Sequence, residues 1–260
     1  MGAPEAETML EAAEKAGLIH MTAFTYEFAP AARYLKQLVE QGELGEIRSV
    51  RAAYLMALSE HLLGWRSQTS LAGSGVLGDI GSHLIHIVLG LAGEIDALSA
   101  WQKRFREDPD SDVEDWISFL AEFSSGAVGT FEISRVCPGR GADVTEEMFI
   151  EVYGSKGGAV FSMQEPRALR VTLGEAARDT ARSLETVEVP RELWKLPGAP
   201  RDVQDGDSRW SYRYDQAYRF VSNIRDGQVR EPSFAEGLRT QRVLDAALLS
   251  AATREWTRVC

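Results

Sequence analysis

The stretch LAGSGVLGDIGSHLIHIVLGL, residues 71–91, decides the fold, because in it a glycine-rich turn leads directly into an apolar helix. At 100° per residue, Asp79, His83 and His86 fall within an arc of roughly 60° on the predicted helix. The apolar stripe beside that arc consists of Ile80, Leu84, Ile87 and Leu91. We therefore expect one face of this helix to enter the core and the neighbouring face to carry chemistry.

Asp79 precedes His83 by four residues, and His86 follows within the next turn. A carboxylate at this spacing can hold the tautomer of an imidazole and raise its basicity, as a proton-transfer residue requires. Alternatively, both histidines are ordinary hydrogen-bonded helix residues. The grouping of the three side chains favours the catalytic interpretation.

Composition narrows the class of protein. The chain has 260 residues, a net charge of −11 and 44% hydrophobic residues, which is ordinary for a globular protein. The acidic balance argues against nucleic acid or an anionic membrane as the main partner. Cys137 and Cys260 form no disulfide framework or zinc pattern, and we find neither a signal peptide nor an apolar run of 18 residues. These features predict a cytoplasmic protein.

The N-terminal residues predict a helix over 4–16 followed by a short, buried parallel strand over 18–24. Such a helix-strand unit normally belongs to a doubly wound sheet. We interpret residues 1–25 as the residual end of a dinucleotide-binding domain and residues 26–260 as a separate domain.

The remaining pattern predicts an α+β domain with a mostly antiparallel sheet and helices on one face. Pro30 opens a helix that Gly42 ends, and a loop with His61, Trp65 and Arg66 precedes the glycine-rich turn. Strands are expected over 46–58, 116–123, 127–134, 148–153, 158–163, 169–173 and 184–189, and closing helices over 210–225 and 234–259, after an irregular excursion over 192–209.

Gly73, Gly75 and Gly78 match the pattern G-x-G-x-x-G, with acidic residues at a suitable distance beyond. A true dinucleotide fingerprint follows a buried strand, whereas residues 66–71 are polar. We therefore do not assign these glycines to a nucleotide site, and the cofactor-binding residues remain unknown.

Four segments in this order resemble the Gfo/Idh/MocA family of NAD(P)-dependent oxidoreductases. They are AFTYEFAPAARYLKQLVEQGELGEIRSV (23–50), GWR (64–66), GSGVLGDIGSHLIH (73–86) and PSFAEGLRTQRVLDAALLSA (232–251). The resemblance implies an N-terminal Rossmann domain that binds NAD or NADP. It also implies a C-terminal α+β domain that supplies substrate contacts and often the homo-oligomer interface.

The resemblance assigns roles to particular residues. Asp79 and His83 match the family's D-x-x-x-H pair, with His83 as proton acceptor from a secondary hydroxyl of a sugar or polyol while hydride leaves the same carbon. Tyr26, Trp65 and Arg66 resemble residues that line the nicotinamide and substrate pocket, and we place His86 with them as substrate-binding.

Two departures concern single positions: the family commonly has arginine after the tyrosine and aspartate three residues beyond the histidine, where this chain has Glu27 and His86. The family's glycine fingerprint and its E-K-P lysine are also not found in the sequence. We therefore expect binding of NAD(H) by this chain alone to be weak or undetectable.

Two alternatives belong to other classes. Asp79, His83 and His86 are residue types that bind zinc or manganese, as in a metal-dependent isomerase or lyase. A non-catalytic oligomerisation module is the other, because an unpartnered apolar strand over 18–24 tends to pair with another chain.

Overall fold

The computed structural model describes residues 2–58, 64–107, 109–140, 147–174, 183–203 and 211–260. The strands are β1 (Ile47–Leu55), β2 (Ile95–Lys103), β3 (Trp116–Phe123), β4 (Val128–Ser134), β5 (Glu147–Gly154), β6 (Gly157–Ser162), β7 (Ala168–Leu173), β8 (Glu185–Glu188) and β9 (Thr257–Arg258). They form one sheet in the order β8-β7-β6-β5-β1-β4-β3-β2-β9. Only β1 and β4 pair in parallel, so the predicted mostly antiparallel sheet is confirmed.

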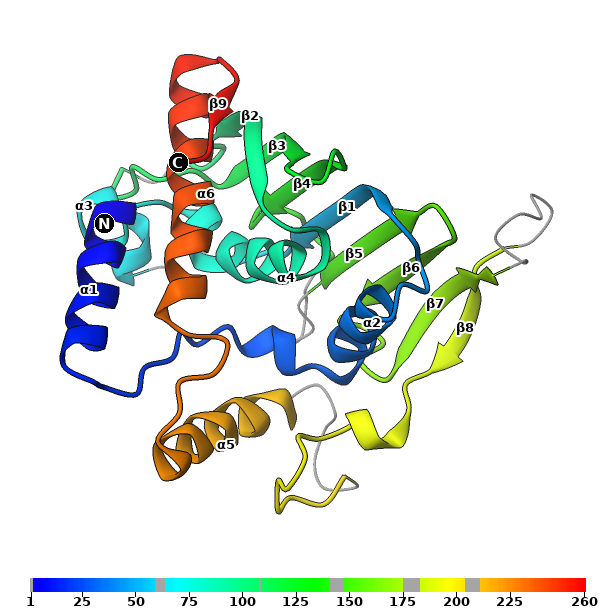
Figure 1. Cartoon of the computed structure of the whole chain (residues 1–260). Helices are drawn as coiled ribbons and strands as arrows, with labels where there is room; N and C mark the ends of the chain where they lie inside the picture. The colour runs from blue at the N-terminus through cyan, green and yellow to red at the C-terminus, as the bar shows by residue number, and fades with distance from the viewer. Residues whose placement is uncertain (1, 59–63, 108, 141–146, 175–182, 204–210) are drawn as a thin grey trace.

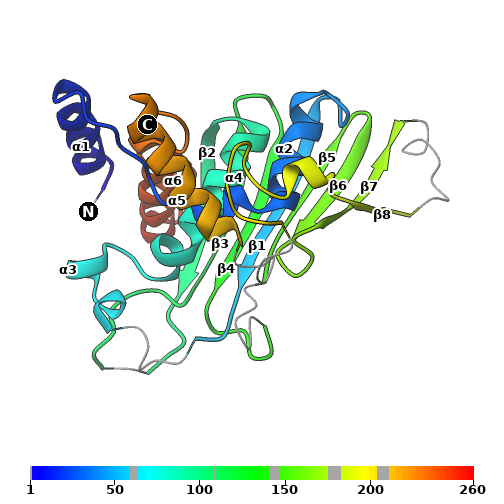
Figure 2. The ribbon, with the colours of Figure 1, turned by 90° about the horizontal axis from the view of Figure 1, so that it is seen from below.

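The helices cover one face of this sheet. They are α1 (Ala3–Lys15), α2 (Pro30–Glu40), α3 (Thr69–Ala72), α4 (Ser82–Ala92), α5 (Ser211–Asp226) and α6 (Phe234–Thr253), with 3₁₀ turns η1 (Thr25–Phe28), η3 (Gly64–Ser67) and η7 (Arg191–Leu193) and a π-helical turn η4 (Leu77–Gly81). Helices α2, α4 and α6 pack against strands β6, β1 and β2 respectively (Figure 1). Helix α1 lies beside α6, on the side away from α2 (Figure 2).

Alternating residues explain why the strands form a two-sided sheet. On β3, Ile117, Phe119, Ala121 and Phe123 are buried, whereas the intervening side chains are partly or fully exposed. A period of two is the pattern of a strand with one face against the core. Both predicted hairpins, β3 with β4 and β5 with β6, are confirmed.

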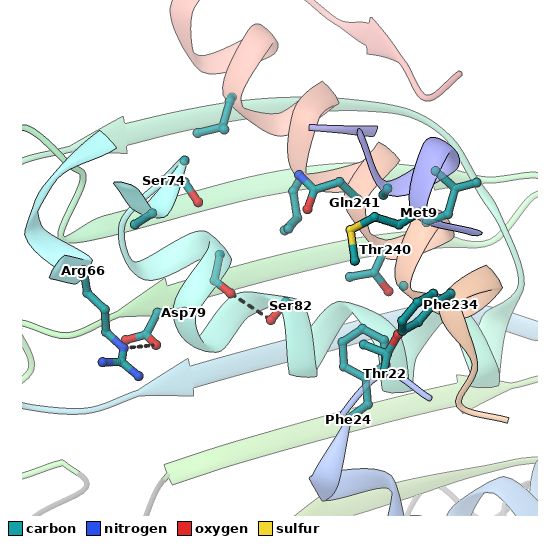
Figure 3. Close-up of a pocket in the computed structure, with 18 of the residues that line it drawn as sticks. Met9, Thr22, Phe24, Arg66, Ser74, Asp79, Ser82, Phe234, Thr240 and Gln241 are labelled. Carbon is teal, nitrogen blue, oxygen red and sulfur yellow. Dashed lines mark hydrogen bonds and ion pairs between the residues drawn. The ribbon is translucent and has the colours of Figure 1, made fainter. Parts of the chain in front are cut away.

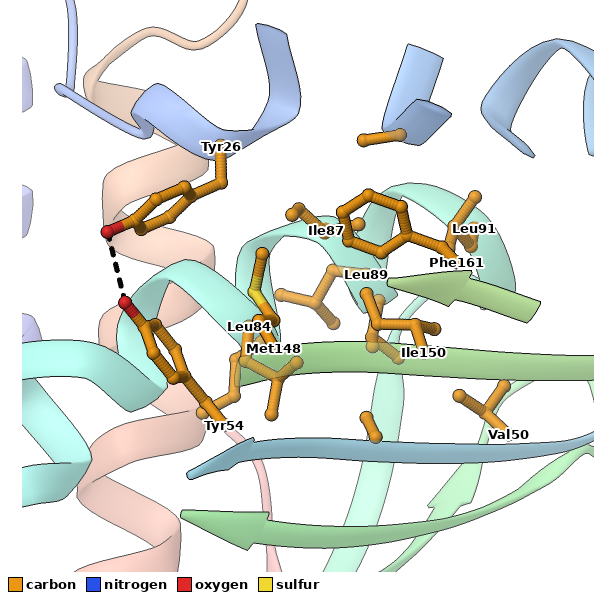
Figure 4. Close-up of a cluster of buried hydrophobic side chains, with 14 of the residues drawn as sticks. Tyr26, Val50, Tyr54, Leu84, Ile87, Leu89, Leu91, Met148, Ile150 and Phe161 are labelled. Carbon is orange, nitrogen blue, oxygen red and sulfur yellow. Dashed lines mark hydrogen bonds between the residues drawn. The ribbon is translucent and has the colours of Figure 1, made fainter. Parts of the chain in front are cut away.

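The core joins the inner sheet face to α2 and α4. Its side chains include Leu84, Leu89, Met148, Ile150 and Phe161, and the hydroxyls of Tyr26 and Tyr54 are hydrogen-bonded at 3.0 Å at its edge (Figure 4). Burial of this continuous apolar cluster is the main force that fixes α4, and with it the histidines, on the sheet.

The strand predicted over residues 18–24 is wrong. This segment has no regular secondary structure and joins no sheet; its backbone N–H at Thr22 donates to the carbonyl of Pro232, and His20 Nδ1 accepts from the N–H of Phe234. Among the described residues, no strand pairs with this segment. The preceding helix and its end at Gly17, where φ is +62°, agree with the prediction.

The central helix also differs from the prediction. The polar residues before the glycine-rich turn form the short helix α3, and the helix beyond begins with the π-helical turn η4 before α4 continues it. The stretch Thr69–Ala92 is long and apolar enough to cross a membrane by composition, but 72% of its most apolar window is buried inside the fold. The α4 part of this stretch is therefore a buried helix of the fold.

Helix α6, strand β2 and the residues outside the described ranges account for the remaining differences. Helix α6 ends at Thr253 instead of continuing to 259, because Arg254 takes a left-handed conformation and the chain turns into β9. Strand β2 has no counterpart among the predicted elements. His61 and part of the excursion over 192–209 lie outside the described residues.

Candidate active site

The π-helical turn places Asp79 against Arg66. Its wider turn changes the angular step that a regular α-helix would give between Asp79 and His83. Arg66 Nε donates to Asp79 Oδ1 at 3.0 Å (Figure 3). No hydrogen bond joins Asp79 to His83, whose buried Nδ1 has no partner among the described residues. The prediction that Asp79 holds the tautomer of His83 is therefore wrong.

Aromatic rings surround His83. The ring of Tyr26 meets it edge-on at 4.8 Å between centroids, and Phe24 does so at 6.0 Å. Burial lowers the pKa of His83 to about 4, with smaller contributions from the charges of His86 and Arg213. The lowered pKa keeps the imidazole neutral near pH 7, so one ring nitrogen is open to a proton, but it also makes His83 a weaker base than an exposed histidine.

The two departures from the family pattern contact each other. His86 Nε2 lies 2.5 Å from Glu27 Oε2, and the His86 ring stacks on Phe24 with centroids 4.0 Å apart and planes 13° from parallel. His86 is only 8% exposed. The sequence shows Glu27 and His86 as two unrelated departures, because they are 59 residues apart. Their contact forms only because the fold packs η1 against α4.

A cavity of about 530 Å³ opens beside Asp79. Phe24, Trp65 and Arg66 line it, together with apolar side chains of α6 and hydroxyls of Thr22, Ser74, Ser82 and Thr240 (Figure 3). Trp65 is 54% exposed, and the Arg66 guanidinium lies 4.5 Å from its ring centre. An exposed indole with a cation above it is suited to packing against a flat or polar ring.

Not every predicted residue lines this cavity. Asp79, Trp65 and Arg66 do, whereas Tyr26, His83 and His86 are not among its lining residues. The rings of His83 and His86 contact Phe24, which lines the cavity. The assignment of these six residues to catalysis and substrate binding stays a prediction. Two further tyrosines contact Tyr26: Tyr54 through a hydroxyl–hydroxyl hydrogen bond and Tyr212 through its ring, at 5.5 Å between centroids. Neither gave a signal in the sequence, because their proximity depends on β1 and α5 meeting at η1.

Glu114 fixes the start of the central helix. Its carboxylate accepts the N–H groups of Gly75 and Leu77 at 2.8–2.9 Å, and burial raises its pKa. A phosphate would need donors of this kind, and these two N–H groups are already occupied by Glu114. The cavity wall fits a nicotinamide or sugar ring, but within the described residues we find no glycine-rich phosphate site.

The metal alternative gains no support. In the part of the chain that the structure describes, no three His, Cys, Asp or Glu side chains come together as ligands. Asp79 is instead paired with Arg66, and His86 with Glu27.

Residues 32–160 match the sequence profile of the GFO/IDH/MocA C-terminal domain. Levoglucosan dehydrogenase of Pseudarthrobacter phenanthrenivorans is 31% identical over 98% of this chain and 70% of its own length. The scyllo-inositol 2-dehydrogenase (NADP(+)) of Bacillus subtilis is 23% identical over 96% and 67%. The solved structure of levoglucosan dehydrogenase with NADH and levoglucosan superposes with a TM-score of 0.86 at 30% identity, covering 100% of this chain and 71% of that one. These relatives are NAD(P)-dependent sugar or polyol dehydrogenases.

Proposed function

The chain belongs to the Gfo/Idh/MocA family of oxidoreductases, and on this premise we propose that it supplies the substrate site of an NAD(P)-dependent dehydrogenase. The substrate is a sugar, polyol or related compound with a secondary hydroxyl. The observation that carries this proposal is a neutral, aromatic-enclosed His83 next to a cavity whose wall bears the Asp79–Arg66 pair.

The roles follow from the contacts. His83 accepts the hydroxyl proton, because its imidazole is neutral near pH 7 and Nδ1 lacks a partner. Asp79 and Arg66 orient the substrate hydroxyls, and Trp65 packs against the substrate ring. Tyr26 lies against the ring of His83 and acts on the substrate through that histidine. A nicotinamide nucleotide, when bound, takes the hydride from the same carbon.

Binding of the nucleotide by this chain alone is expected to be weak. The N–H groups of Gly75 and Leu77 are already bound by Glu114, so they contribute nothing to pyrophosphate recognition. Tight, stoichiometric binding of NADH or NADPH in a calorimetric titration would contradict this expectation.

The experiment that tests the function measures substrate binding and turnover together. Levoglucosan, scyllo-inositol and glucose are each offered to the chain, with binding followed by saturation-transfer NMR and reduction of NAD⁺ or NADP⁺ followed by absorbance. We expect His83→Gln to retain binding and lower any oxidation rate about 100-fold. Absence of both binding and oxidation for every polyol, in a correctly folded chain, would refute the proposal.

We also propose that the helix-free face of the sheet forms a contact between copies of this chain. Trp101 on β2, Leu120 on β3 and Val128 at the start of β4 are 65%, 53% and 54% exposed. An exposed apolar strand surface of this kind is typical of an interface. Light scattering should show a dimer or larger that Leu120→Glu dissociates and Leu249→Glu, on α6, does not; a monomeric wild type would refute the interface.

A further inference from the structure

We propose that Glu27 and His86 are positioning residues, a clamp that fastens η1 to α4 and so holds Tyr26 and Phe24 in place around His83. This inference rests on the proposed role of His83 as proton acceptor. Glu27, which stands where the family commonly has arginine, then has the role of fixing η1 to α4.

The Glu27–His86 pair connects two elements of the fold. Glu27 belongs to η1 and His86 to α4, and their 2.5 Å contact is a side-chain bond between these two elements close to His83. His86 is 9% exposed at its side chain and Glu27 25%, so the contact is largely shielded from water. A hydrogen bond in such surroundings is stronger than one on the surface.

The clamp also holds the two aromatic rings that border His83. Phe24 contacts both histidines: it is stacked on His86 at 4.0 Å and edge-on to His83 at 6.0 Å between ring centroids. Tyr26, the residue before Glu27, meets His83 at 4.8 Å. Movement of η1 away from α4 would therefore shift both rings that border the imidazole of His83.

The charged groups around the pair come from four elements and one loop. His83 lies on α4 beside His86, and the charge of Arg213 on α5 acts on His83. Lys36 of α2, Glu231 and, on α6, Glu236 and Arg239 line a small cavity next to Glu27 and His86. Each of these four has a bond elsewhere: Lys36 with Glu231, Glu236 with Ser233, and Arg239 with Glu94. The clamp is thus a pair, without a third bonded member among the described residues.

The test observes His83 directly and needs no cofactor. In isotopically labelled chain, the ring signals of His83 and its pKa are measured by NMR in the wild type, in Glu27→Gln, in His86→Asn and in the exchanged pair E27H/H86E. The matched control is Lys36→Gln, which breaks a neighbouring exposed ion pair that lines the same cavity.

We expect each single substitution to displace the His83 ring signals, because Tyr26 and Phe24 move. Loss of the His86 charge should also raise the pKa of His83 above about 4. The exchanged pair should restore the bond between η1 and α4 and so displace the ring signals less than either single substitution, even though position 86 no longer carries the ring that stacks on Phe24. The control should leave the signals unchanged. Should a single variant fail to fold, Glu27→Asp and His86→Gln are milder substitutes.

Unchanged His83 signals in both folded single variants, or an exchanged pair no closer to wild type than the singles, would overturn the clamp. A chain that shows these shifts but neither binds nor oxidises any of the offered compounds would refute the proposed function and leave the clamp intact, so the two failures are distinguishable.

Discussion

The carboxylate of Asp79 accepts a hydrogen bond from Arg66, thirteen residues earlier in the chain, at 3.0 Å. Both side chains line the cavity, and their exposed fractions are 25% and 41%. An ion pair that is this accessible to water contributes only about 0–1 kcal/mol to stability. Its position on the cavity wall therefore points to a role in binding rather than in folding.

Asp79→Asn should separate these two roles. We expect the free energy of unfolding to change by less than about 1 kcal/mol, whereas kcat/KM for polyol oxidation falls about 100-fold because Arg66 loses its countercharge beside the reacting hydroxyl. Urea denaturation and initial rates of NAD(P)H formation measure the two quantities. Arg225→Gln, which breaks an exposed pair with Asp226 on α5, is the control and should alter neither. Wild-type kcat/KM in Asp79→Asn would remove Asp79 from the site.

The lowered pKa of His83 makes stability depend on pH. The unfolded chain takes up this proton near 6.5 and the folded chain only at about 4, so protons favour the unfolded state between these values. The contribution of His83 is complete above pH 6.5 and is lost as pH falls towards 4, by about 3 kcal/mol at roughly 1.4 kcal/mol per unit. His83→Gln should flatten the unfolding free energy over this range. Parallel pH profiles for wild type and variant would show that His83 is not buried as described.

The sequence predicted the sheet and its hairpins because alternation on strands such as β3 reports directly which face is buried. It could not place Asp79, because the π-helical turn breaks the 100° step on which the predicted arc depended. Nor could it pair Glu27 with His86, which are 59 residues apart. The strand expected over 18–24 failed for a related reason: an apolar residue pattern is compatible with a strand, but a strand also needs a neighbour to pair with, and none of the described strands pairs with this segment.

Glu114 is expected to destabilise the fold as it ionises. Burial raises its pKa above the ordinary 4.5, so the folded state retains the proton longer than the unfolded state and stability falls as pH rises through this region. Glu114→Gln keeps an acceptor for the N–H groups of Gly75 and Leu77 and removes the titration. The unfolding free energy of the wild type should therefore decline relative to this variant as pH increases from 4 towards neutral. A constant difference between the two would contradict the prediction.

Gly75 should tolerate no side chain, because the backbone of Glu114 passes directly over it. A Cβ at Gly75 would lie 2.1 Å from the carbonyl oxygen and 2.9 Å from the nitrogen of Glu114, and neither atom can move without breaking the bonds that start the central helix. Gly75→Ala should therefore cost about 1–3 kcal/mol of unfolding free energy or more. It should also lower polyol oxidation, since Asp79 and His83 follow on the same helix.

Gly90, near the end of α4, provides the matched control. A Cβ there meets nothing within 4 Å, so Gly90→Ala should stabilise the helix by about 0.5–1 kcal/mol and leave oxidation unchanged. Urea denaturation measures the free energy of unfolding of both variants. The same glycine-to-alanine change is thus compared at the start and near the end of one helical stretch. If Gly75→Ala were as stable as wild type, Glu114 could not lie against the glycine-rich turn, and the geometry derived for Asp79 and Arg66 would fail with it.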